Sequence, residues 1–113
     1  MINYNDKTFR SIANTASGEV NSETLFHYSQ EENIITGNYA GGSIRSGQLI
    51  ALIDDEGNLN MRYQHINTAG ELLTGICSSI PQLLPSGKIQ LHETWQWTGG
   101  KEGSGNSIIE EVA

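Results

Sequence analysis

The stretch spanning residues 88–98 constrains the fold more than any other part of the chain. Polar side chains alternate along it with a second set that includes Ile89, Leu91, Trp95 and Trp97. Successive side chains of a β-strand point to opposite faces of the sheet, so this period of two predicts a half-buried antiparallel strand.

Glu93 lies on the same face of this stretch as the apolar and aromatic residues. A buried carboxylate is costly unless it is paired, protonated or hydrated. His65 or an arginine could pair with it, and such a pair could bind the polar group of a ligand or transfer a proton. The alternatives are a purely structural buried pair, or a Glu93 side chain near a hydrated rim.

Seven further segments have strand-like sequences bounded by turn-forming residues. They are residues 8–13, 23–30, 34–40, 43–53, 59–66, 72–79 and 107–112. Asp54–Asn58 has the composition of a hairpin turn. Gly47 indicates a bend or bulge within its strand. Pro81 and Pro85 predict a longer link, which can include a short helical turn.

Short strands recur roughly every dozen residues, and no segment is convincingly helical. A meander of about eight antiparallel strands closes most simply into an up-and-down barrel, because closure removes the exposed edges of an open sheet. We therefore predict an all-β protein whose single domain, residues 1–113, is a small barrel. A barrel of about eight strands is either filled by its own side chains or holds one small ligand.

Charge and composition exclude several classes of partner. The chain carries 13 acidic and 6 basic residues, with a formal net charge of −7, and the basic residues are scattered. This argues against binding to nucleic acid or to an anionic membrane surface, both of which require clustered Lys and Arg. The single cysteine, Cys77, cannot form an internal disulfide, and residues 1–7 do not resemble a signal peptide, so we expect a cytoplasmic protein.

If the face of Trp95 points into the barrel, matching faces on neighbouring strands define candidate ligand-binding residues. These are Phe26, Tyr28, Tyr39, Met61, Tyr63, His65, Glu93 and Trp95. Thr74, Ile76 and Ser78 could extend this face on the next strand. Apolar walls with a few convergent polar groups are typical of small-molecule sites. The alternative is that these aromatic side chains fill the barrel and their hydroxyls hydrogen-bond locally.

Other motifs give no metal or cofactor site. On the alternation, His27 and His92 point outward and His65 inward, so the three histidines do not converge on a metal. The glycine-rich stretch 99–105 lacks the spacing of a phosphate-binding loop and is better explained as a flexible loop at the barrel mouth. Cys77 has no evident catalytic partner, which favours a packed side chain.

Residues 4–11, 47–54 and 91–97 resemble a family of small bacterial proteins often labelled N-acetylglutamate synthase. The resemblance spans nearly the whole chain and implies acetyl transfer from acetyl-CoA to glutamate. The Gln/Arg-x-x-Gly-x-Gly/Ala motif of acetyltransferases is not found in this sequence. At the level of the fold, the meander resembles the calycin-type barrels of the lipocalin-like and fatty-acid-binding group.

Three functions of different classes remain open. The leading hypothesis is a binding protein that holds an apolar or amphipathic metabolite against Phe26, Tyr63 and Trp95, with His65 and Glu93 fixing its polar end. The second is an enzyme, either the labelled acetyltransferase or one that uses Glu93 in acid–base chemistry. The third is an interaction protein whose outer sheet face forms a homodimer.

Overall fold

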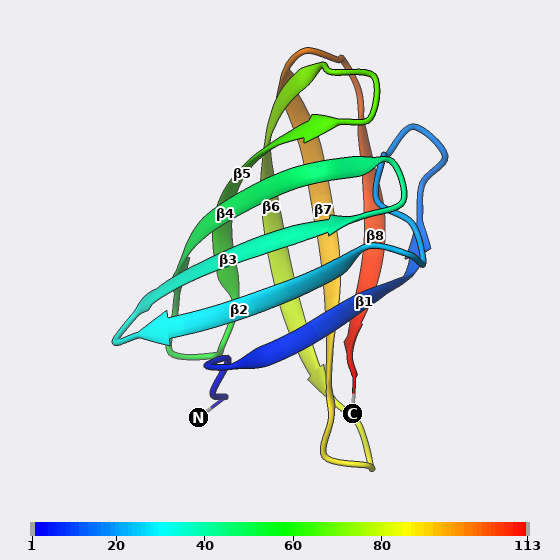
Figure 1. Ribbon diagram of the computed structural model, residues 1–113. Coiled ribbons are helices and arrows are strands. Elements are labelled where there is room, and N and C mark those ends of the chain that lie inside the picture. Colours follow the sequence, from blue (N-terminus) through cyan, green and yellow to red (C-terminus); the bar gives the residue numbers. More distant parts are fainter. Residues whose placement is uncertain (1, 113) are drawn as a thin grey trace.

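The computed structural model describes residues 2–112 and shows eight antiparallel strands closed into a barrel (Figure 1). The strands are β1 (Lys7–Asn14), β2 (Leu25–Glu31), β3 (Ile34–Gly41), β4 (Ile44–Ile53), β5 (Leu59–Asn67), β6 (Leu72–Leu83), β7 (Ile89–Gly99) and β8 (Ser104–Glu111). Each strand pairs with the next, and β8 pairs back with β1. The predicted all-β, closed meander is confirmed. Residues 2–112 include no helix long and apolar enough to cross a membrane.

The largest error in the predicted boundaries concerns the region of Pro81. No link or helical turn follows residue 79; instead β6 continues through Pro81 to Leu83. The ladder between β5 and β6 ends at the Leu59–Ser79 pair, whereas the ladder between β6 and β7 continues beyond it. A proline is tolerated where a strand has a partner on one side only, because its missing N–H removes no ladder bond on the open side.

The predicted bulge lies just before Gly47. The register of the β4–β5 pair shifts between Ile44 and Ser46, and that of the β3–β4 pair shifts between the Tyr39–Gly47 and Gly41–Ile44 pairs. A Cβ atom at Gly47 would meet the ring of Tyr39. The glycine is therefore explained by the close approach of an aromatic ring across the strand pair.

The inward face of β6 also differs from the prediction. Thr74, Ile76 and Ser78 point away from the interior, which holds the alternate residues Leu73, Gly75, Cys77 and Ser79. Gly75 pairs with Tyr63 on β5, and a Cβ atom at this position would clash with the Tyr63 ring. The small side chains of β6 make room for larger ones on β5 and β7, so the size of the side chains misled the sequence-based assignment.

The barrel interior is packed solid at one end, which we call the terminal end because both chain termini lie there (Figure 1). Tyr4, Phe9 and Tyr28 form an aromatic cluster at this end, with ring centroids 4.9–6.5 Å apart. The hydroxyl of Tyr4 donates a 2.6 Å hydrogen bond to the carbonyl of Gly57 in the β4–β5 turn. The segment that precedes β1 thus closes this end of the barrel.

The opposite end, the loop end, carries the β1–β2 connection, residues 15–24, and the β3–β4, β5–β6 and β7–β8 turns. Among the contacts that anchor residues 15–24 to other elements, three are made to backbone carbonyls of this loop. Asn14 donates to the carbonyl of Val20 (2.9 Å), Ser43 donates to that of Glu19 (2.8 Å), and the Trp97 indole lies 3.4 Å from that of Ser17. The β1–β2 loop therefore closes the loop end.

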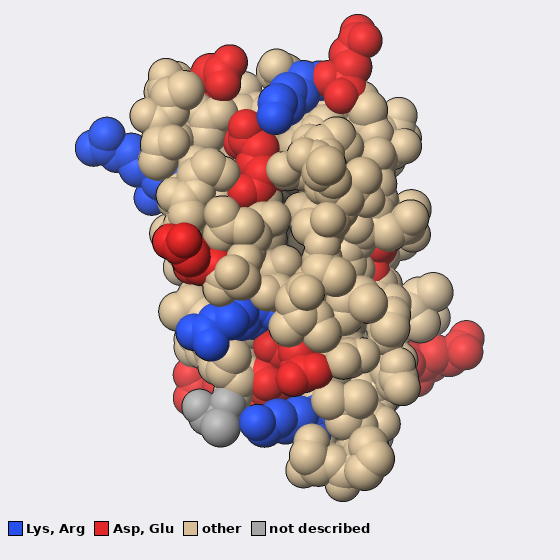
Figure 2. Space-filling model, turned by 90° about the vertical axis from the view of Figure 1, so that its right-hand side faces the viewer, with Lys and Arg blue, Asp and Glu red and all other residues tan. Residues whose placement is uncertain are grey.

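Charged side chains are dispersed over the outer surface. On the face shown in Figure 2, Lys and Arg side chains lie beside Asp and Glu side chains and do not gather into a basic patch. This agrees with the scattered basic residues of the sequence.

Candidate functional site

A cavity of about 60 Å³ lies inside the barrel, between the packed terminal end and the β1–β2 loop. One buried water needs at least about 10–15 Å³ on the same scale, so the cavity can hold only a few non-hydrogen atoms. All eight candidate ligand-binding residues line it: Phe26, Tyr28, Tyr39, Met61, Tyr63, His65, Glu93 and Trp95. The lining is completed by Asn14, Gly18, Glu19, Val20, Leu49, Cys77, Trp97 and Ser107.

Glu93 sits among three hydroxyl- or thiol-bearing side chains from the two flanking strands. Ser79 on β6 donates a 2.7 Å hydrogen bond to its Oε2 atom, and Ser107 on β8 donates a 3.2 Å bond to Oε1. The thiol of Cys77 lies 3.7 Å from Oε2. Ser79 and Ser107 face Glu93 because each pairs directly with it in the ladder.

The environment of Glu93 disfavours its ionised form. Burial raises the pKa of Glu93, and the hydrogen bonds from Ser79, Ser107 and Cys77 offset this only in part. Hydroxyl groups are dipoles without net charge, so they compensate the desolvation of a carboxylate less well than a cation would.

Tyr28 supplies the one buried polar side-chain atom of residues 2–112 that lacks a hydrogen-bond partner. Its hydroxyl is fully buried, and the side chain lines the cavity. Burial raises the pKa of Tyr28, and the nearby charge of Glu93 raises it further. Tyr28 is therefore a neutral phenol whose O–H group has no hydrogen-bond acceptor among residues 2–112. We call Tyr28, Glu93 and Ser107 the polar floor of the cavity.

Aromatic rings form the walls of the cavity. Trp97 packs against Trp95 at 5.5 Å and edge-on against Tyr63 at 5.8 Å between ring centroids. Phe26 stacks on Tyr39 at 5.0 Å. The indole N–H of Trp95 donates to Asn14 at 3.0 Å, which fixes the ring. These rings already pack against one another, so they offer a ligand an apolar surface of defined shape and few hydrogen bonds.

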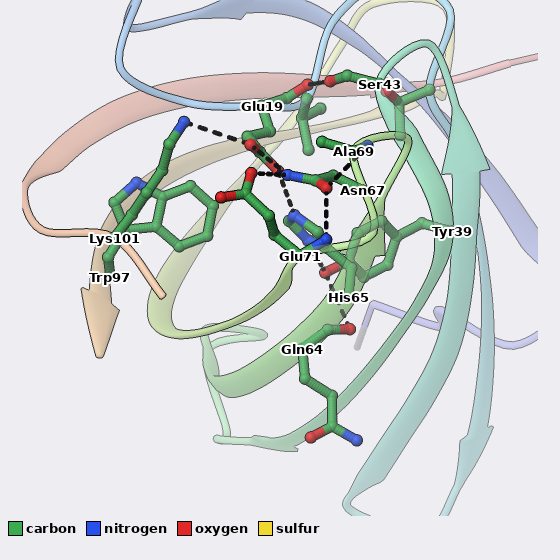
Figure 3. Close-up of polar contacts among 12 residues, drawn as sticks. Glu19, Tyr39, Ser43, Gln64, His65, Asn67, Ala69, Glu71, Trp97 and Lys101 are labelled. Carbon is green, nitrogen blue, oxygen red and sulfur yellow. Dashed lines mark hydrogen bonds and ion pairs between the residues drawn. The ribbon is translucent and has the colours of Figure 1, made fainter. Parts of the chain in front are cut away.

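A second polar cluster lies at the loop end (Figure 3). Glu19, from the β1–β2 loop, lies 2.8 Å from Nε2 of His65 and 3.3 Å from Nζ of Lys101. The amide of Asn67 donates a 3.0 Å hydrogen bond to the same carboxylate. We call His65, Asn67 and Lys101 the mouth cluster.

Glu19 is held in its ionised form. Burial alone would raise the pKa of this carboxyl, but hydrogen bonds from His65, Asn67 and Lys101 outweigh that effect and lower the pKa below its usual value. A carboxylate that accepts several hydrogen bonds is stabilised relative to the neutral acid.

One sequence-based alternative paired His65 with Glu93. In the structure the two side chains have separate partners. His65 contacts Glu19 and the hydroxyl of Tyr39, the latter 2.9 Å from its Nδ1 atom. Glu93 contacts only hydroxyl and thiol groups. Sequence reasoning missed Glu19 because it lies in a loop, where alternation gives no information about direction.

The histidines are placed as the alternation predicted. His27 and His92 lie on the outer surface, where they contact Asp6 and Gln82, and His65 lies inside. Within residues 2–112, no group of three or more His, Cys, Asp or Glu side chains is arranged to hold a metal ion. Cys77 is buried and lines the cavity, in agreement with a packed side chain.

Comparison with known proteins gave one family. A family model described as "Avidin-like protein" matches residues 2–112. No curated protein and no solved structure matched the chain. None of these comparisons supports the N-acetylglutamate synthase label, whose acetyltransferases are expected to be α/β proteins, whereas residues 2–112 form an all-β barrel. From the match, which spans nearly its whole length, the chain belongs to the avidin-like protein family.

Proposed function

We propose that this protein binds a small apolar or amphipathic molecule inside the barrel, with the polar end of that molecule on the polar floor. The observation that carries the proposal is the buried hydroxyl of Tyr28, which makes no hydrogen bond to residues 2–112 and belongs to a side chain that lines the cavity. Buried polar groups are nearly always hydrogen-bonded, because an unpaired one costs about 1–3 kcal/mol.

The polar floor restricts the chemistry of the ligand. Tyr28 can donate one hydrogen bond, and Glu93 can accept one or, when protonated, donate one. A ligand group with an acceptor beside a donor, such as an amide, a urea or a hydroxy-carbonyl group, complements this pair. The walls formed by Trp95, Phe26 and Tyr63 then suit an apolar remainder.

Membership of the avidin-like family supports this proposal. Avidin-like barrels bind small ligands such as biotin. The cavity of about 60 Å³ is too small for a molecule of that size while residues 15–24 cover it. A ligand with more than a few non-hydrogen atoms therefore requires the β1–β2 loop to move.

Native mass spectrometry against a metabolite library that includes biotin, followed by tryptophan fluorescence titration, tests the proposal. We expect a ligand that shifts the emission of Trp95 and Trp97, and we expect Trp95→Ala to abolish binding. Tyr28→Phe should weaken binding about tenfold or more, because it removes the free hydroxyl, yet it should leave stability unchanged or raise it.

Tyr4→Phe provides the matched control. The Tyr4 hydroxyl bonds to Gly57 and does not line the cavity, so its removal should lower stability by about 1 kcal/mol and leave affinity unchanged. Equal affinity of the Tyr28→Phe variant and the wild type would remove Tyr28 from the site. The absence of any ligand for the folded protein would refute the proposed function.

We also propose that the outer face of the barrel supports a homodimer. Ile50 and Leu52 on β4 and Ile80 on β6 are more than half exposed, an unusual number of large aliphatic side chains for one side of a small barrel. Sedimentation velocity of the wild type and of a Leu52→Lys variant tests this. A monomer at all concentrations in the wild type would refute it.

A further inference from the structure

Glu19 is a carboxylate supplied by the protein itself to the mouth of its own cavity. Its side chain is 10% exposed, and that of its partner His65 is 1% exposed. Residues Gly18, Glu19 and Val20 line the cavity from the loop side. The hydrogen bond between Glu19 and His65 therefore lies at the point where a ligand entering from the loop end would pass.

The donors that hold Glu19 do not depend on the β1–β2 loop for their positions. Asn67 on β5 accepts hydrogen bonds from the backbone of Ala69 and Glu71 through its Oδ1 atom, which directs its amide N–H group toward Glu19. Asn67 also donates to the Glu71 carboxylate at 2.9 Å. Its orientation is thus fixed by the β5–β6 turn.

His65 is fixed in the same way. The hydroxyl of Tyr39 lies 2.9 Å from its Nδ1 atom, and the ring lies edge-on to Tyr39 and Trp97 at centroid distances of 5.6 and 5.7 Å. This leaves Nε2 directed at the carboxylate. The third donor, Lys101 in the β7–β8 turn, is 43% exposed and lies 6.0 Å from the centre of the Trp97 ring.

We propose that the mouth cluster of His65, Asn67 and Lys101 is a carboxylate-binding site of the cavity, that Glu19 occupies this site while the β1–β2 loop is closed, and that a ligand bearing a carboxylate displaces Glu19. This inference rests on the proposed function and adds to it a ligand class: an amphipathic molecule with a carboxylate at the end nearest the loops. The geometry shows that the site accepts a carboxylate, because one is bound there.

Displacement replaces the Glu19 carboxylate by a ligand carboxylate at the same hydrogen-bond donors. A ligand carboxylate would receive the same charge-assisted hydrogen bonds that Glu19 gives up, while the released Glu19 side chain becomes hydrated. The β1–β2 loop then opens, and its backbone contacts at Val20 and Ser17 break. The net driving force then comes from burying the apolar part of the ligand against the aromatic walls.

Chemical rescue tests the site without requiring the natural ligand. Glu19→Ala removes the tethered carboxylate, and free acetate should then bind in its place. We expect sodium acetate to raise the thermal midpoint of Glu19→Ala by several degrees more than equal concentrations of sodium chloride or acetamide, whereas the wild type should show no such difference. Adding Lys101→Met to Glu19→Ala should reduce the acetate effect.

Glu23→Ala is the matched control, because Glu23 lies on the same loop, is exposed, and makes no hydrogen bond through its carboxylate to residues 2–112. It should respond to acetate as the wild type does. An acetate effect on Glu19→Ala no larger than that of chloride or acetamide would overturn the inference.

A second measurement uses the wild-type protein, in case Glu19→Ala does not fold. Hexanoate and hexanamide have the same chain length, but only hexanoate carries a charge. We expect hexanoate, and not hexanamide, to accelerate amide hydrogen exchange at Gly18 and Thr24, whose N–H groups bond within the loop. Unchanged or slower exchange in hexanoate would overturn displacement.

The two proposals fail separately. If the metabolite screen yields a ligand without a carboxylate and acetate rescues nothing, the carboxylate site is wrong and the proposed function stands. If acetate rescues Glu19→Ala but no ligand is found for the folded wild type, the mouth cluster binds carboxylates and the proposed function is wrong.

Discussion

Two carboxylates, Glu19 and Glu93, line opposite ends of the same cavity, and their pKa values are shifted in opposite directions. Glu93 is a buried residue of β7, whereas Glu19 is a partly exposed residue of the β1–β2 loop. The pKa of Glu19 is lowered from its usual value of 4.5, whereas that of Glu93 is raised from the same value. Burial acts in the same direction on both groups but is deeper for Glu93, so the opposite shifts reflect both the depth of burial and the hydrogen-bond partners.

The partners differ in kind. Glu19 receives hydrogen bonds from an ammonium, an imidazole and an amide, whereas Glu93 receives them from two hydroxyls and a thiol. The mouth of the cavity is consequently organised around a fixed negative charge, and the floor around a carboxyl that resists ionisation. A ligand that spans the cavity meets hydrogen-bond donors at one end and a carboxyl group flanked by hydroxyl groups at the other.

The opposite pKa shifts of Glu19 and Glu93 make the two groups change the stability of the protein with pH in opposite directions. Glu19 has a lower pKa in the folded state than in the unfolded state, so its contribution to stability is present above pH of about 4.5 and is lost as the pH falls through the folded value. Glu93 has a higher pKa when folded, so stability is lost as the pH rises from about 4.5 toward the folded value.

The largest effect is expected from Trp97→Ala, which should reduce the difference in pKa between Glu19 at the mouth of the cavity and Glu93 at its floor. Trp97 packs against Tyr63, His65 and Trp95, and its removal leaves a cavity beneath the loop. We expect a loss of about 3–5 kcal/mol in the free energy of unfolding, measured by urea denaturation. Water entering from the mouth should also bring the pKa of Glu93 closer to its usual value, as followed by carboxyl NMR titration. An unchanged Glu93 titration would show that Trp97 does not shield the floor.

The next effect is that of Glu19→Ala on stability. Removing this carboxylate leaves His65 and Asn67 with buried donors that have lost a partner. We expect a loss of about 1–3 kcal/mol at pH 7, measured by urea denaturation. The loss should shrink on acidification below about pH 4.5, because the wild type then loses the Glu19 contribution as well. Glu23→Ala should change stability by less than about 0.5 kcal/mol.

The sequence predicted the floor of this site better than its mouth. Glu93 could be placed inside because it interrupts a strict alternation on β7, and the alternation on β5 turned Tyr63 and His65 inward correctly. These residues belong to regular strands, in which direction follows from position along the chain. The closed barrel could be predicted for the same reason, from the rhythm of strands and turns.

The rest depended on information that alternation does not contain. Glu19 lies in a loop and its partner Lys101 lies in a turn 82 residues away, so neither side chain has a direction that a strand period can predict. On β6 the inward positions are occupied by Gly75, Cys77 and Ser79, whose small size reflects the neighbouring rings of Tyr63 and Trp95. The inward face of a strand can therefore be its less hydrophobic one when the adjacent strands supply large side chains.

Glu93→Gln removes the titrating carboxyl group from the floor of the cavity, so it isolates the contribution of Glu93 to the pH dependence of stability. Glutamine has the shape of the protonated acid and can still bond to Ser79 and Ser107. We expect the two proteins to be about equally stable near pH 4 and the variant to gain over the wild type as the pH rises, by up to about 1.4 kcal/mol per pH unit between pH 4.5 and the folded pKa of Glu93. Urea denaturation across pH 4–8 measures this. A constant difference across that range would contradict a raised pKa.

The smallest effect is expected from Lys101→Met, which tests how much of the charge of Glu19 depends on the exposed edge of the mouth cluster. Lys101 is 43% exposed and lies 3.3 Å from Glu19, so solvent screens the pair, and its loss should cost less than about 1 kcal/mol. The difference between the variant and the wild type, measured by urea denaturation, should disappear in about 1 M sodium chloride, where the screening length falls to about 3 Å. The pair of Glu19 with the buried His65 should be insensitive to the same salt. If Lys101→Met instead lowers the free energy of unfolding as much as Glu19→Ala does, the exposed lysine and not the buried donors stabilises the Glu19 carboxylate. The difference in pKa between Glu19 and Glu93 would then depend on a surface charge.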